Sequence, residues 1–230
     1  MKNSTKNIQN SNEEIANAYD HLTPPDYPIA YKARKWFFCG LPFYVNEHVL
    51  VPRADTEILV QEVVKHCPEN ASVLDLCTGS GCIAIALYAK GFTDITASDI
   101  SEETLKVARL NAKTNKAKIK FIQSNLFENI KTKFDIIASN PPYIKTNEIG
   151  IHDKSILHEP RHALDGGVDG LGFYRRIIAE VPKHLDDNGK IFFEIGDKQQ
   201  AEEVKTLLHE NKFCDIQIIK DRVIHARKIN

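Results

Sequence analysis

Asp75-Leu76-Cys77-Thr78-Gly79-Ser80-Gly81 is the stretch that decides the fold. It follows Ser72-Val73-Leu74, which predicts a buried strand, and it precedes Cys82-Ile83-Ala84-Ile85-Ala86-Leu87, which predicts a helix. A glycine-rich turn from a strand into a helix lets a ligand approach the backbone closely. The spacing also fits the G-x-G-x-x-A dinucleotide pattern, which is weak evidence by itself.

A carboxylate strengthens this prediction of a ligand site. Asp99 comes directly after the strand-like run Asp94-Ile95-Thr96-Ala97-Ser98. A carboxylate at that place can accept hydrogen bonds from ribose hydroxyls. The turn and Asp99 together predict an adenosine-containing cofactor. NAD and S-adenosylmethionine both satisfy these features.

Asn140-Pro141-Pro142-Tyr143 separates the two cofactors. This motif follows the apolar run 134–139, so it lies where a strand ends. The Asn140 side-chain oxygen and the Pro141 carbonyl are two hydrogen-bond acceptors, the prolines stiffen the turn, and Tyr143 offers a flat ring. These groups suit a planar NH2 group and would aim its nitrogen at an electrophile, so they favour S-adenosylmethionine. The alternatives are an Asx turn at Asn140 and a tyrosine packed on the core.

The alternation of expected elements defines the fold class as α/β. Strands are expected near 72–77, 94–98, 118–122, 134–139 and 190–195, helices near 82–90, 101–113, 170–184 and 197–211, and two final strands near 213–219 and 222–228. Such alternation predicts a mainly parallel sheet with helices on both faces. The last two strands are joined so tightly around Asp221 that they must be antiparallel neighbours.

Ligands of such sheets lie beyond the carboxyl ends of the strands. The run 77–81, Asp99, Asn125 and Asn140 all follow predicted strands at that edge. Four segments that are separate in the sequence are therefore expected to meet in one crevice.

The chain before the glycine-rich turn divides into two parts. Residues 1–27 are polar, and we expect a tail that is disordered, weakly helical or the remnant of a helical docking domain. Residues 28–70 should contain a hairpin with strands at 36–39 and 43–45, a short strand at 49–51, and a helix capped by Thr56. Residues 71–230 would then form the main domain.

Further motifs occur in a fixed order along the chain. They are Gly40-Leu41-Pro42-Phe43-Tyr44-Val45, Val49-Leu50-Val51-Pro52-Arg53, Asp55-Thr56-Glu57, Glu159-Pro160-Arg161, Ala163-Leu164-Asp165-Gly166-Gly167, Asp169-Gly170-Leu171 and Phe193-Glu194-Ile195-Gly196. Together with Asn140-Pro141-Pro142-Tyr143, this set resembles the HemK/PrmC family of glutamine N5-methyltransferases, which act on peptide chain release factors. The resemblance implies a Rossmann-like, seven-stranded class I methyltransferase sheet, S-adenosylmethionine as cofactor and S-adenosylhomocysteine as product.

The resemblance also implies roles for single residues. The cofactor-binding set is Asp75, Cys77, Thr78, Gly79, Ser80, Gly81, Asp99, Asn125, Leu126 and Asn140; the catalytic set is Asn140, Pro141, Pro142 and Tyr143; Arg53 and Glu57 would lie on the substrate side. Two alternatives stay open. Asp75 either faces the methionine amino group or stabilises its own turn, and Arg53 and Glu57 can instead form a surface ion pair at i, i+4.

Composition limits the partners. A formal net charge of -1 argues against broad electrostatic binding to nucleic acid. The alternatives to a release factor as substrate are a glutamine of a large-subunit ribosomal protein and, less favoured, an amino group of adenine in nucleic acid.

Five scattered cysteines suggest neither a disulfide framework nor a zinc site, and no metal is expected at His158 and His162. Without a signal peptide or long apolar stretch, a cytoplasmic protein with no membrane contact is expected. A monomer is also expected.

Overall fold

The fold is organised around one sheet of seven strands. The computed structural model describes residues 2–22, 24, 26–151 and 153–229. The strands lie in the order β5-β4-β3-β6-β7-β9-β8. Their bounds are β3 (Val73–Leu76), β4 (Ile95–Asp99), β5 (Lys120–Gln123), β6 (Phe134–Ser139), β7 (Leu185–Glu194), β8 (Phe213–Ile219) and β9 (Val223–Lys228).

Five neighbouring strands of this sheet, from β5 to β7, are parallel. Strand β9 then pairs antiparallel with both β7 and β8. The predicted Rossmann-like sheet and its antiparallel last pair are therefore confirmed. Strand β3 lies in the middle of the parallel part and is buried along its whole length, which explains its apolar sequence.

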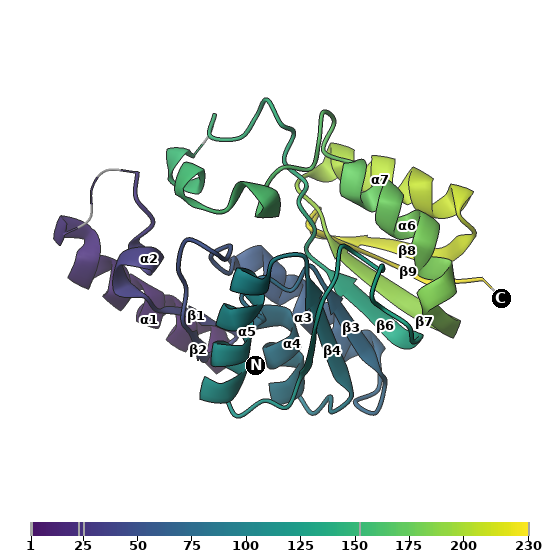
Figure 1. Ribbon diagram of the computed structural model, residues 1–230, viewed down its shortest axis with the longest axis horizontal. Helices are drawn as coiled ribbons and strands as arrows, with labels where there is room; N and C mark the ends of the chain where they lie inside the picture. Colours follow the sequence, from purple (N-terminus) through teal and green to yellow (C-terminus); the bar gives the residue numbers. More distant parts are fainter. Residues whose placement is uncertain (1, 23, 25, 152, 230) are drawn as a thin grey trace.

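Helices cover both faces of the sheet (Figure 1). On one face lie α3 (Ala54–His66), α4 (Cys82–Ala89) and α5 (Glu102–Thr114), and on the other lie α6 (Gly172–His184) and α7 (Lys198–Glu210). Each face has its own buried cluster of apolar side chains. The Ser101 side chain accepts a hydrogen bond from the Thr104 amide at 3.2 Å, which confirms its predicted role as the N-cap of α5.

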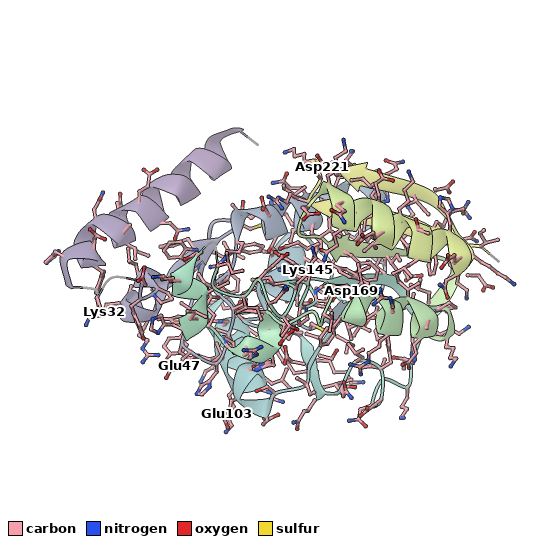
Figure 2. All side chains as sticks on the ribbon, turned by 90° about the horizontal axis from the view of Figure 1, so that it is seen from above. Lys32, Glu47, Glu103, Lys145, Asp169 and Asp221 are labelled. Carbon is pink, nitrogen blue, oxygen red and sulfur yellow. The ribbon has the colours of Figure 1, made fainter. Side chains whose placement is uncertain are left out.

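The N-terminal region consists of helices and a hairpin. It contains α1 (Lys2–Tyr19), η1 (Asp20–Leu22), α2 (Ile29–Ala33) and the predicted hairpin of β1 (Trp36–Phe38) and β2 (Leu41–Phe43). Of the alternatives expected for this tail, the structure has a helical one over 2–22, while residues 1, 23 and 25 lie outside the described residues. Asn12 fixes α1 to the hairpin, because its side chain both donates to and accepts from the Phe37 backbone, at 3.0 and 2.9 Å. Figure 2 shows α1 at the periphery of the molecule.

Two local predictions in the segment before α3 are wrong. Residues 49–51 form no strand, since the Val49 amide donates back to the Asn46 carbonyl and the Val51 amide donates to the Glu159 side chain. Thr56 does not cap α3. The helix already begins at Ala54, and the Thr56 amide donates to the Arg53 carbonyl within its first turn.

Two short 3-10 helices, η2 (Lys154–His158) and η3 (Arg161–Ala163), interrupt the long loop that follows β6. The described part of the chain contains no helix long and apolar enough to cross a membrane.

Candidate active site

A cavity lies beyond the carboxyl ends of β3, β4 and β6, where the parallel sheet predicts a ligand site. Among the residues that line it are the predicted Cys77, Thr78, Gly79, Ser80, Asp99, Asn125, Leu126, Asn140 and Pro142. The sheet thus brings together the four segments that the sequence placed at one edge. The other predicted site residues, which are Asp75, Gly81, Pro141, Tyr143, Arg53 and Glu57, are not among the residues that line this cavity.

Asp75 holds the glycine-rich turn in shape. Its Oδ2 atom accepts hydrogen bonds from the Thr78 hydroxyl at 2.5 Å and from the Ala84 amide at 3.1 Å. The turn-stabilising alternative is therefore observed for this oxygen. Oδ1 has no partner within the described residues, and burial raises the pKa of the carboxyl group to about 7. A contact of Oδ1 with a ligand stays a prediction.

The two glycines of the turn serve different purposes. Gly79 has a φ of +56°, and a Cβ built there would have no heavy atom within 4 Å, so the backbone is open to a ligand. Gly81 has a φ of +83°, and a Cβ there would lie 3.1 Å from Ile85 Cδ1 and 3.3 Å from Ala108 Cβ. Gly81 therefore permits the close packing of α4 on α5 and does not line the cavity.

Asp99 is fixed beside the turn. Its Oδ2 accepts a hydrogen bond from the Gly79 amide at 3.0 Å, and its Oδ1 accepts one from the Ser101 amide at 3.1 Å. Burial raises the pKa of this carboxyl group, and the two amides oppose that rise. Each carboxylate oxygen keeps a further lone pair, so Asp99 can still accept from a ligand hydroxyl.

The wall of the cavity beyond β5 contains the predicted Asn125 and Leu126 and also contacts that were not predicted. The Asn125 oxygen, which was expected to be available for adenine, accepts a hydrogen bond from Arg176 at 3.0 Å, while its Nδ2 donates to Glu128. Leu126 supplies buried apolar surface. Arg176 and Phe173 from the start of α6 also line the cavity, and neither was predicted. Their sequence gives no signal, because only the fold brings α6 over this edge.

Asn140 lines the cavity and has an oriented side chain. Its Nδ2 donates to the Thr56 hydroxyl at 3.4 Å, and Oδ1 accepts no hydrogen bond within the part of the chain that the structure describes. Thr56 also lines the cavity, although it was predicted only as a helix cap. One end of the carboxamide is thus held by α3 while the other remains free to accept.

Tyr143 does not line this cavity. Its hydroxyl donates to Glu194 at 3.4 Å, its ring packs against Gly196, and its carbonyl accepts from Gln200 at 3.0 Å. Stacking of Tyr143 on a substrate amide stays a prediction.

Glu194 ends β7 and is 1% exposed. Burial raises the pKa of its carboxyl group to about 7, which the nearby side chains of Thr56, Tyr143 and Asn140 partly counteract. The expectation that this carboxylate satisfies backbone donors is wrong, because within the described residues Oε1 accepts from the Tyr143 side chain and Oε2 has no hydrogen-bond partner. Its strand-end position was visible in the sequence, but the pairing of β7 with β6 was not.

The alternative of a surface ion pair between Arg53 and Glu57 is wrong. Arg53 pairs with the buried Glu159, whose second oxygen accepts from the Val51 amide at 3.0 Å, so Glu159 braces the loop after Tyr143. Glu57 accepts from the Cys39 amide at 2.7 Å and holds the turn of the hairpin. A role for Arg53 and Glu57 on the substrate side stays a prediction.

The donors and acceptors of the cavity fit an adenosine-containing cofactor. Asp99 offers carboxylate oxygens, Gly79 offers open backbone, and Leu126 offers an apolar surface. The buried hydroxyls of Ser80 and Ser98 also line the cavity and have no hydrogen-bond partner among the described residues. Buried polar atoms without partners are uncommon, and a bound ligand would supply partners here.

The sheet order, the glycine-rich turn and the motif at the end of β6 define the class as a methyltransferase. Residues 53–169 match the family model described as Methyltransferase small domain. The release factor glutamine methyltransferase of Geobacter sulfurreducens is 39% identical over 197 residues, which are 84% of this chain and 69% of that protein. That of Lactococcus lactis is 40% identical over 224 residues, which are 93% of this chain and 81% of that protein. This chain belongs to the release factor glutamine methyltransferase family.

Solved structures share the fold. The ribosomal protein L11 methylase of Lactobacillus delbrueckii subsp. bulgaricus has a TM-score of 0.58 at 24% identity, covering 77% of this chain and 81% of that one. A Thermus thermophilus 16S rRNA N2 G1207 methyltransferase in complex with AdoMet and guanosine has a TM-score of 0.64 at 16% identity, covering 84% and 49%. At these identities the likeness supports the architecture alone.

Proposed function

We propose that this chain transfers a methyl group from S-adenosylmethionine to the side-chain amide nitrogen (N5) of a glutamine in the Gly-Gly-Gln loop of a peptide chain release factor, with S-adenosylhomocysteine as product. The observation that carries the proposal is the free Oδ1 of Asn140 at the cavity, with Nδ2 held by Thr56. The names of the relatives from Geobacter and Lactococcus support this substrate.

S-adenosylmethionine, when bound, supplies a methyl group that its sulfonium already activates. The residues that would hold this cofactor are Asp99, through its carboxylate oxygens, Gly79, through its open backbone, and Leu126, through apolar contact. The unpartnered Oδ1 of Asp75 lies buried behind the same turn and is suited to an ammonium group.

The protein then has to place a weak nucleophile. A carboxamide nitrogen reacts poorly because its lone pair is delocalised into the carbonyl, so orientation matters more than a strong base. Asn140 Oδ1 accepts one hydrogen of the substrate amide, and the Pro141 carbonyl accepts the other. Both acceptors favour the positive charge that develops on nitrogen, so they stabilise the transition state more than the ground state. The amide proton leaves to water after the transfer.

Thr56 gives this arrangement its direction. Because its hydroxyl accepts from Nδ2 of Asn140, the carboxamide is held with the oxygen toward the substrate. The two prolines of the motif fix the backbone that carries both acceptors, since a proline ring restricts φ. The acceptor pair is therefore largely organised before the substrate arrives.

Mass spectrometry on a purified release factor tests the proposal. After incubation with the chain and S-adenosylmethionine, the peptide that contains Gly-Gly-Gln should gain the mass of one methylene unit on its glutamine. Asn140→Ala should lose this gain while it still binds S-adenosylmethionine, and a release factor with that glutamine replaced by glutamate should not react. Methylation of a ribosomal protein in place of the release factor, or full activity of Asn140→Ala, would contradict the proposal.

A further inference from the structure

Three side chains with metal-ligating atoms meet under α3, away from the cavity. They are Glu62 and His66 from the second half of α3 and His225 from β9, and their ligand atoms all lie within 4.8 Å of one another. Glu62 and His66 stand at i, i+4, so they share one face of the helix. His225 comes from the sheet beneath, where its ring stacks on Phe192 and lies 4.7 Å from the ring of His66.

We propose that Glu62, His66 and His225 form a binding site for a single zinc ion that connects α3 to β9. Two imidazole nitrogens and one carboxylate oxygen are a ligand set that zinc accepts, and a water molecule would complete a tetrahedron. This site is separate from the proposed methyl transfer, because none of the three residues lines the cavity.

The spacing of the first two ligands already suits the ion. Glu62 Oε2 and His66 Nε2 are 3.1 Å apart. Bonds of about 2.0–2.1 Å from a tetrahedral zinc place neighbouring ligand atoms roughly 3.3 Å apart. An ion between these two atoms would replace the shared proton without moving α3. His225 has to come closer, since the ligand atoms of the three residues are spread over distances of up to 4.8 Å.

The second observation is the Nε2 atom of His225. The residue is 6% exposed, and this nitrogen has no hydrogen-bond partner among the described residues. An unpartnered buried nitrogen is costly, and a metal ion would use its lone pair.

Two lysines next to the cluster limit the affinity. Lys65 lies 3.4 Å from Glu62 Oε2, but its side chain is 63% exposed and can turn into solvent. The Lys190 ammonium donates to the His66 carbonyl at 2.7 Å and stays near the site. The three ligands contribute one negative charge, and Lys190 offsets it, so binding should be weaker than at a site built from four thiolates.

The sequence gives no signal of this site. Glu62 and His66 are close together in the chain, but the third ligand lies far downstream, and two ligands with helical spacing are common without a metal. The antiparallel insertion of β9 between β7 and β8 brings His225 under α3.

Zinc titration of the tag-free chain tests the proposal. Competition against a chromophoric zinc chelator should give one site, and Co²⁺ in its place should give the visible absorption bands of tetrahedral coordination. Glu62→Gln and His225→Gln should each weaken zinc binding at least tenfold. His209→Ala, which removes an exposed histidine of α7, is the matched control and should bind zinc like the unchanged chain.

Thermal unfolding gives a second measurement. Free zinc at about one hundred times its Kd should raise Tm by about 5–10 °C, and this rise should disappear in both site variants. S-adenosylmethionine binding shows that each variant is folded. If the folded chain takes up no zinc, or if both variants bind zinc as tightly as the unchanged chain, the proposal is wrong. Methyltransferase activity plays no part in this decision.

Discussion

The hydroxyl of Tyr143 donates to the carboxylate of Glu194 at a distance of 3.4 Å. This contact joins the motif after β6 to the end of β7, the next strand in the sheet. The Tyr174 hydroxyl donates to the Glu194 backbone carbonyl at 2.7 Å, so the main chain that carries this carboxylate is also fixed. We therefore expect Glu194 to act as a positioning residue, which keeps Tyr143 in place without lining the cavity.

Glu194→Ala should lower kcat about 10–100-fold, because a displacement of roughly 1 Å in a reacting group costs this much. The KM for S-adenosylmethionine should change little. Glu194→Gln, which keeps the hydrogen-bonding shape, should retain most of the activity. Steady-state kinetics with a release factor measures these values, and Glu210→Ala on the exposed end of α7 is the control. A loss confined to the cofactor KM would contradict the positioning role.

Glu194 should also make stability depend on pH. Its folded pKa is about 7, above the ordinary 4.5, so between these values the folded protein binds more protons than the unfolded chain. The contribution of Glu194 to stability is thus fully present below about pH 4.5 and is lost as pH rises through 7. Urea unfolding measures the free energy of unfolding at pH 5 and at pH 8. Between these two pH values this free energy should fall by about 2 kcal/mol less in Glu194→Gln than in the unchanged chain. The pKa of Asp75 is also raised by folding, but Asp75 is present in both proteins, so its effect cancels in the comparison. Equal falls in the two proteins would show that Glu194 is not protonated in the folded state.

Thr56→Val removes the hydroxyl that accepts from Asn140 Nδ2 and keeps the shape of the side chain. The carboxamide of Asn140 can then turn over and present nitrogen to the substrate. We expect kcat to fall about 10-fold, with less than a twofold change in S-adenosylmethionine affinity. Thr114→Val on the exposed end of α5 is the matched control. Unchanged turnover of Thr56→Val would mean that another group orients Asn140.

The sequence was sufficient to predict what depends on local pattern. The strand at 73–76, the helix after Gly81 and the placement of Asp99 and Asn140 at one sheet edge follow from apolar runs, glycine spacing and the geometry of parallel sheets. Ser101 was identifiable as an N-cap because capping depends on residues within one turn.

The unpredicted contacts depend on segments that are far apart in the chain. Arg53 has a carboxylate at i+4, but Glu159 is its partner, since the loop after β6 returns over the start of α3. The oxygen of Asn125 accepts from Arg176 because α6 begins above the same cavity. Thr56 looked like a cap because Ala54 and Asp55 carry no signal that the helix has already begun. Each error is one of tertiary context and not of residue chemistry.

Substitutions at the two glycines of the turn should affect different properties, namely stability at Gly81 and cofactor binding at Gly79. Gly81→Ala places a methyl group 3.1 Å from Ile85 Cδ1 at a positive φ, so the free energy of unfolding should fall by about 2–3 kcal/mol. Gly79→Ala meets no protein atom within 4 Å, so only the backbone cost of about 1–2 kcal/mol remains. The methyl group that Gly79→Ala adds would lie where the backbone is open to the cavity. The affinity for S-adenosylmethionine should therefore fall at least tenfold. Chemical denaturation and calorimetric titration of both variants measure the two effects. If Gly79→Ala binds the cofactor normally while Gly81→Ala does not, the assignment of the two roles is reversed.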